Sequence, residues 1–155
     1  MQFQAGAVLM GNPSAPWIKY TLQYIYCEKY YETMSWRVEF HPNFREEFDE
    51  LGDAVQDELA AMIKLLELVG PQLKRPRSDT LNGSAHANMK ELRFDADGGV
   101  WRVAYAFDPE REAILLVAGD KSGGSEKKFY KRLIKRADAR FDQHLAALEK
   151  ARRKR

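Results

Sequence analysis

Three consecutive strand-like segments, of which the first two have a two-residue hydrophobic period, constrain the fold of this chain most strongly. They cover residues 89–94, 100–107 and 113–118, and short turn-forming stretches separate them. Such a period places alternate side chains on opposite faces of a β-strand. Asp97-Gly98-Gly99 has the composition of a hairpin turn, and Asp108-Pro109 ends the second segment. We therefore expect a small, mostly antiparallel sheet whose third segment, apolar on both sides, lies in the interior.

Two helical segments precede these strands. Residues 36–40 alternate like a half-buried strand, and Pro42 then suits the first turn of a helix in which Asn43 and Glu46 have capping-box spacing. A longer helix follows, and Asp53 with Gln56 offers a cap at its N-terminus. Both helices are expected to pack on the sheet.

Beyond these helices the pattern is a loop, the strands and one more helix. Gly70-Pro71 ends the second helix, and residues 71–88 are expected to form a loop anchored by Leu73 and Leu81. A C-terminal helix begins near Ser125 and runs into a basic tail from about residue 149. The predicted fold class is α+β with the order β-α-α-β-β-β-α.

Residues 1–33 differ from the remainder of the chain. They contain five tyrosines that show no clean periodicity, and a Gly-Asn-Pro-Ser-Ala-Pro stretch interrupts the segment before these tyrosines. We interpret them as an N-terminal extension upstream of the true start at Met34, with a single domain over residues 34–155. An aromatic-rich element that packs on the domain is the alternative.

The composition excludes several classes of protein. The chain has 155 residues and a single cysteine, Cys27, so no internal disulfide can form. No segment approaches the roughly 18 apolar residues of a membrane-spanning helix, and no Cys/His cluster has zinc-ligand spacing. A cytoplasmic protein without a metal, a cofactor or a membrane partner is expected.

Charge is distributed unevenly although the formal net charge is only +2. Residues 35–70 hold three basic and nine acidic side chains, which gives −6, whereas residues 121–155 hold thirteen basic and four acidic ones, which gives +9. A +9 segment attracts polyanions at long range. A solvated helix face followed by a basic tail is the alternative.

Strand alternation predicts one cationic site. The bulky side chains of residues 100–107 share one face, while Arg102 stands among small residues on the other. If the bulky faces of neighbouring strands coincide, Arg93 lies beside Arg102, and two arginines on one face suit a phosphate. Lys121, after the third strand, reaches the same face, and Tyr130 offers a ring for stacking on a base. Ordinary surface ion pairs, and a core role for Tyr130, remain the alternatives.

Several of these segments together resemble a known family. Their residues are 36–44, 88–94, 101–105, 119–121 and 129–130, and they occur in an order and at spacings similar to those of the HigB-like branch of the RelE toxin superfamily. The resemblance covers about residues 34–148. It implies a RelE-like fold in which two helices pack on one face of the sheet and an RNA site lies on the other.

The family also implies a function. Its members are the toxins of type II toxin–antitoxin systems, ribosome-dependent endoribonucleases that cleave mRNA through attack of the 2′-OH and need no metal. The expected partners are a helix-turn-helix antitoxin, the ribosome and mRNA. A non-catalytic RNA- or ribosome-binding relative and a gyrase-poisoning toxin of the same fold are the alternatives.

The resemblance and the charge pattern together assign the site residues. The catalytic set is Arg93, Arg102, Lys121, Lys90 and Tyr130, with Lys90 or Lys121 as the candidate general base. The expected RNA-binding set is Phe129, Lys127, Lys128, Lys131, Arg132 and His86, and His86 is also a weaker candidate for proton transfer. The acidic helical pair is expected to offer a separate surface to the antitoxin.

Overall fold

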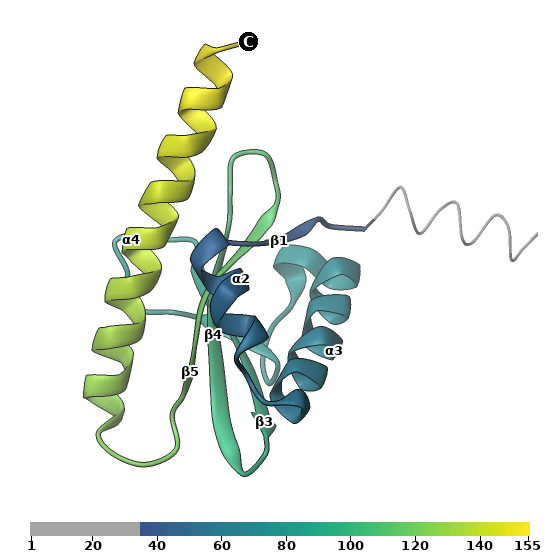
Figure 1. The fold of residues 1–155 in the computed structure, drawn as a ribbon, viewed down its shortest axis with the longest axis vertical. Coiled ribbons are helices and arrows are strands. Elements are labelled where there is room, and N and C mark those ends of the chain that lie inside the picture. Colours follow the sequence, from purple (N-terminus) through teal and green to yellow (C-terminus); the bar gives the residue numbers. More distant parts are fainter. Residues whose placement is uncertain (1–34) are drawn as a thin grey trace, which may run out of the picture. The chain divides into compact units, whose positions relative to one another are not determined.

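The computed structural model describes residues 35–155, shown in Figure 1. The predicted extension and the start at Met34 lie outside these described residues. The elements, in chain order, are β1 (Val38–Phe40), α2 (Pro42–Asp49), α3 (Asp53–Val69), the 3-10 turn η1 (Gly70–Gln72), β2 (Ser78–Thr80), β3 (Met89–Ala96), β4 (Gly99–Phe107), β5 (Ala113–Asp120) and α4 (Glu126–Arg153). No helix in this part of the chain is both long and apolar enough to cross a membrane.

The strands form one five-stranded sheet in the order β1-β5-β4-β3-β2. β2, β3, β4 and β5 pair with their neighbours in antiparallel fashion, and only β1 is parallel to its neighbour β5. The predicted α+β class with a mostly antiparallel sheet is confirmed, and β5 is an interior strand as expected. The predicted turn between β3 and β4 is also confirmed, because Asp97 and Gly98 have φ values of 50° and 71°, as primed hairpin turns require.

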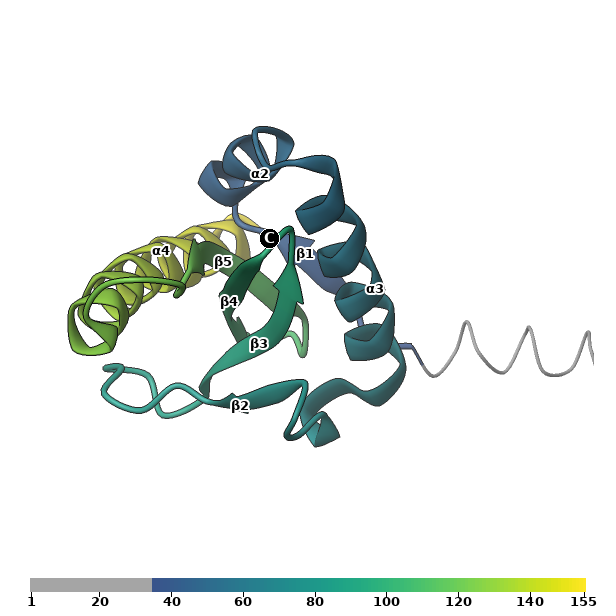
Figure 2. The same ribbon diagram turned by 90° about the horizontal axis from the view of Figure 1, so that it is seen from below.

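Helices cover both faces of the sheet, as Figure 2 shows. α2 and α3 pack on the bulky face, where Leu92, Val103 and Tyr105 are buried with the apolar side of α3. α4 packs on the opposite face, which the sequence led us to expect to be open. This expectation was wrong because Ala104 and Ala106 leave a shallow surface that the large side chains of α4 fill. A cavity remains beside β2 and β3.

β2 is the element that sequence analysis missed, since it lies within the predicted loop. Its three residues have no hydrophobic alternation, and it exists through pairing with β3, in which Asp79 lies opposite Glu91. Ser78 is buried and shares a 2.7 Å hydrogen bond with the hydroxyl of Tyr105. Leu81, which follows, is buried as predicted.

The predicted helix boundaries hold, but the caps differ. His41, not Asn43, caps α2, because its Nδ1 accepts the Asn43 N–H at 3.3 Å and Pro42 is already helical. Gly52 is the N-cap of α3. Gln56 instead donates its side-chain amide to the Phe48 and Leu51 carbonyls at 3.0 and 2.9 Å, so it closes the end of α2.

Candidate functional site

Arg93 and Arg102 lie directly opposite each other on β3 and β4. Their side chains share the face that α4 partly covers, so the prediction from strand alternation is confirmed. The Arg102 side chain is only 7% exposed, and its guanidinium donates to the Trp101 carbonyl at 2.8 Å. Arg93 is more accessible, at 26%.

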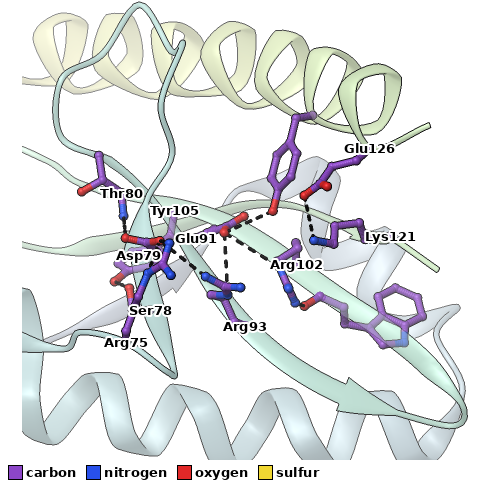
Figure 3. A network of polar contacts seen from close by, with 12 residues as sticks. Arg75, Ser78, Asp79, Thr80, Glu91, Arg93, Arg102, Tyr105, Lys121 and Glu126 are labelled. Atoms are coloured by element: carbon purple, nitrogen blue, oxygen red, sulfur yellow. Dashed lines mark hydrogen bonds and ion pairs between the residues drawn. The ribbon is translucent and has the colours of Figure 1, made fainter. Parts of the chain in front are cut away.

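Glu91 occupies the space between these two arginines, as Figure 3 shows. Its Oε1 lies 3.9 Å from the Arg93 Nε and 3.8 Å from the Arg102 Nε, and it accepts a 3.3 Å hydrogen bond from the Tyr130 hydroxyl. Its Oε2 and the Arg102 Nε are both buried without a hydrogen-bond partner. Burial raises the pKa of Glu91 above its ordinary value, although Tyr130 and the two arginines oppose this shift.

The turn after β5 brings Lys121 to the same place. Asp120 Oδ1 accepts the backbone N–H groups of Val100 and Ser122 at 3.0 and 2.8 Å, which fixes the turn. The Lys121 Nζ then lies 2.9 Å from the Glu126 Oε1 and 5.7 Å from the centre of the Tyr130 ring. Lys121 and Tyr130 therefore meet beside the arginine pair.

β2 supplies the opposite wall of the site. Asp79 Oδ2 accepts from the Arg75 Nε at 2.7 Å and lies 3.4 Å from the Arg93 guanidinium. The hydrogen bond from Arg75 holds the pKa of Asp79 below its ordinary value. Arg93 thus faces two carboxylates, that of Asp79 on β2 and that of Glu91 on β3.

Together these side chains enclose a cavity of about 330 Å³. This volume lies near the lower end of the roughly 300–1,000 Å³ typical of ligand sites. Its lining consists of Arg75, Asp79, Thr80, Leu81, Asn82, Glu91, Arg93, Lys121, Glu126 and Tyr130. Guanidinium and ammonium groups beside an aromatic ring suit a ligand that carries both a phosphate and a base.

Lys90 does not join this cavity, which corrects the predicted catalytic set. Alternation along β3 directs it to the other face, where its Nζ donates to the Pro71 and Leu73 carbonyls at 3.2 and 3.3 Å. Burial lowers the pKa of Lys90. Its contacts hold the segment that follows α3, so its position is structural.

Phe129 and His86 also lie away from the cavity lining. Phe129 is 8% exposed and belongs to the core beneath α4, so the structure does not bring it together with the cavity, and its contact with RNA stays a prediction. His86 shares a 2.8 Å contact with Asp142 and packs edge-on against Phe141. Its ring therefore belongs to the interface between α4 and the loop before β3.

The remaining predicted RNA-binding residues are exposed on α4. They are Lys127, Lys128, Lys131 and Arg132, and none of them lines the cavity. Arg132 borders a second, smaller cavity of about 220 Å³, which lies between α4 and β5. Their contact with RNA stays a prediction.

Sequence reasoning did not include the acidic side chains of the site. Glu91 was not among the predicted site residues, although it stands two residues before Arg93 and thus on the same face of the strand. Asp79 and Arg75 carried no such signal, because only the pairing of β2 with β3 brings them to the cavity.

The fold and the cavity define a small α+β protein with a cavity, lined by both basic and acidic side chains, beside the helix that covers one sheet face. The family model described as phage derived protein Gp49-like matches residues 46–142. Two Mycobacterium tuberculosis proteins, named as candidate toxins HigB2 and HigB3, are 47% identical over 96 residues and 48% identical over 85 residues. These matches cover 61% and 55% of this chain, and 47% and 72% of the respective relatives. The chain thus matches only about half the length of HigB2.

Two solved structures are also similar. A mutant of the Escherichia coli toxin RelE in the free state has a TM-score of 0.49 at 17% identity, over 66% of this chain and 98% of RelE. The archaeal RelE–RelB complex from Pyrococcus horikoshii has a TM-score of 0.44 at 18% identity, over 59% of this chain and 100% of the matched one. The Gp49-like model matches more than half of the chain, so the chain belongs to the Gp49-like family, and it is similar to the candidate toxins HigB2 and HigB3.

Proposed function

We propose that this protein is the toxin of a toxin–antitoxin system and acts as a ribosome-dependent endoribonuclease on mRNA in the cytoplasm. The observation that carries the proposal is the convergence of Arg93, Lys121 and Tyr130 on one cavity, with Arg102 buried directly beside it, opposite Arg93 and next to Glu91. The family supplies the reaction class. The cavity supplies groups suited to it.

The proposed reaction uses a nucleophile that RNA itself carries. The 2′-OH gives its proton to a base and its oxygen attacks the adjacent phosphorus. The bond to the 5′-oxygen of the next nucleotide breaks, that oxygen takes up a proton as it leaves, and the products are a 2′,3′-cyclic phosphate and a 5′-OH. Negative charge grows on the phosphoryl oxygens in the transition state. Arg93 and Lys121 are the accessible donors for this charge, and one such donor is worth about 3 kcal/mol in comparable sites.

The other two groups have distinct roles in this proposal. Tyr130 is half-buried and presents its ring to the cavity, where a base can stack on it. Arg102 lies beneath Glu91 and adds positive potential from the sheet. Of the two candidate bases, Lys121 lines the cavity and Lys90 does not.

The antitoxin is proposed to bind the acidic pair of helices α2 and α3. α2 and α3 pack on the sheet face opposite α4, as Figure 2 shows, and both helices carry exposed acidic side chains. They include Glu46, Asp49, Glu50, Asp53, Asp57 and Glu58. A partner with a basic surface suits this region.

One observation favours the non-catalytic alternative. Arg93, Arg102 and Lys121 each contact a carboxylate, namely Glu91, Asp79 or Glu126. RNA must therefore compete with these ion pairs. A relative that binds RNA without cleaving it would retain the same contacts.

Growth arrest tests the proposal. Induced expression of the full chain is expected to arrest a bacterial host with cleaved mRNA, and Arg93→Ala or Arg102→Ala is expected to relieve the arrest. Lys90→Ala is the matched control, because Lys90 lies on the same strand but on the other face and should keep the arrest. Primer extension on host mRNA locates the cuts, and circular dichroism with immunoblotting checks folding and abundance.

Two outcomes would contradict this function. Arrest that persists in both arginine variants would remove the cavity from the mechanism. Arrest with intact mRNA and broken DNA would favour a gyrase poison.

A further inference from the structure

Glu91 is the most enclosed carboxylate of the cavity. Its side chain is 5% exposed, compared with 28% for Asp79 and 67% for Glu126. Charged and titratable groups face it from every packed element: Arg93 on β3, Arg102 on β4, Asp79 on β2, Arg75 before β2, Tyr130 and Glu126 on α4, and Lys121 before α4. Glu91 is thus an internal anion at the point where the positive groups converge.

The position of Glu91 is the one that an RNA phosphate needs. A phosphate that contacts Arg93 and approaches Arg102 has to lie next to the Glu91 Oε1, which is within 4 Å of both guanidinium groups. An RNA phosphodiester stays ionised at any physiological pH. Two neighbouring anions in a poorly hydrated site repel each other strongly.

Glu91 has little freedom to withdraw from that repulsion. β3 is paired on both sides at this residue, with Asp79 of β2 and Ala104 of β4. Tyr130 covers it from α4. Its Oε2 is buried and makes no hydrogen bond, so that atom can accept a proton without losing a contact. Burial already raises its pKa, which lowers the free energy of protonation.

We propose that Glu91 is a positioning residue that holds Arg93, Arg102 and Tyr130 together as their counter-ion in the free protein and takes up one proton from solvent when an RNA phosphate binds. This inference rests on the proposed function. It predicts that RNA binding and pH are linked. Because the complex binds one more proton than the free protein, affinity increases as pH falls, by up to tenfold per pH unit.

Calorimetry measures this linkage directly. The probe is a ten-nucleotide single-stranded RNA with 2′-O-methyl groups, which cannot be cleaved, titrated into the full chain at constant ionic strength between pH 5.5 and 8.0. The binding enthalpy, measured in buffers of different ionisation enthalpy, reports the protons taken up. We expect up to one proton for the wild type.

Two variants assign the proton to its carboxylate. In Glu91→Gln the neutral amide imitates the protonated acid, so we expect no proton uptake, a flat pH profile and affinity at pH 8 at least tenfold above the wild type. Asp79→Asn removes the other carboxylate that contacts Arg93 and should retain the uptake. If Glu91→Gln does not fold, the wild-type calorimetry still tests the proposal, because absence of proton uptake would overturn it, and retained uptake in Asp79→Asn excludes the other carboxylate that contacts Arg93.

The outcomes separate this inference from the proposed function. RNA binding without proton uptake in the wild type, or uptake that persists in Glu91→Gln, would overturn the role of Glu91 and leave the nuclease proposal intact. Wild-type affinity that is independent of pH, together with loss of cleavage in Glu91→Gln, would make Glu91 a general base instead. Absence of RNA binding at every pH would overturn the role of Glu91, whereas the proposed function is decided separately by the growth-arrest experiment.

Discussion

Phe129 shows how one small neighbour, Gly119, determines whether an aromatic residue packs in the core or is free to contact a ligand. A Cβ atom added to Gly119 would lie 2.8 Å from the Phe129 Cε2 and 3.2 Å from its Cζ. The ring can therefore approach β5 this closely because position 119 has no side chain. Tyr130, one residue later, turns towards the cavity.

Gly119→Ala is expected to destabilise the protein by about 1–3 kcal/mol, the usual cost of overpacking a core. Urea denaturation measures this loss. Phe129→Leu removes the ring atoms that would clash, so the double variant should be less destabilised than the sum of the two single ones. Strictly additive losses would show that the two side chains do not meet.

Single residues also show what the sequence can predict about the site. Strand alternation correctly placed Arg93 beside Arg102, since both belong to long regular strands. The same alternation places Lys90 on the opposite face, and only the family resemblance had moved it into the site. Glu91 shares the face of Arg93, so its role was accessible to the same reasoning.

At the scale of elements, the long regular segments were predictable and the short ones were not. α3, β4 and α4 each bury a periodic set of side chains, which the sequence displays directly. β2 has three residues and no such pattern, because its formation depends on an edge of β3 that is distant in sequence. The cavity wall formed by Asp79 could therefore not be predicted from the local sequence pattern.

The cap of α2 makes stability depend on pH. His41 is 5% exposed and its Nδ1 must be unprotonated to accept the Asn43 N–H. Burial, followed by the charges of Arg140 and His144, lowers its pKa, whereas Glu47 and a hydrogen bond with Gln143 oppose the shift. The unfolded chain therefore takes up this proton more readily than the folded one.

The sign of the effect follows from this depressed pKa. The contribution of His41 is fully present above the unfolded value of 6.5 and is lost as pH falls below it. We expect the free energy of unfolding to decrease between pH 7.5 and 5.5, and to decrease less in His41→Asn, because asparagine caps helices without titrating. Urea titrations at both pH values measure the difference. An equal decrease in the two proteins would assign the pH dependence to other groups.

At the scale of the described domain, charge is separated between the two faces of the sheet. The acidic side chains lie on α2 and α3, and the basic ones lie along α4 (Figure 2). The separation was predictable from segment charges. The pairing of individual charges was not, because it depends on contacts between elements: Glu47 of α2 binds Arg136 and Arg140 of α4.

These pairs distinguish two basic regions of α4. Arg152 and Arg153, near the C-terminus, contact Glu110 and Glu149. Within residues 35–155, by contrast, no ion pair involves five exposed cations of the N-terminal half, which are Lys127, Lys128, Lys131, Arg132 and Lys135. Unpaired cations release more counterions on binding RNA than cations that already have carboxylate partners. The segment beside Tyr130 should therefore dominate long-range attraction to the ribosome.

Salt dependence of ribosome binding compares the two regions. Replacement of Lys127, Lys128 and Lys131 by glutamine is expected to reduce the slope of log K against log salt by about 2, if each lysine contacts one phosphate. Removal of Arg152–Arg155 should weaken binding and flatten the slope by a smaller amount, because two of these arginines have acidic partners. Both slopes are measured by cosedimentation of the full chain with ribosomes. The salt concentration is varied between about 50 and 300 mM, the range in which phosphate contacts weaken. A larger effect of the tail would place the main contact at the last turns of α4, which extend past the sheet (Figure 1). If neither change affects the slope, the whole basic face of α4 is a solvated surface that does not bind the ribosome.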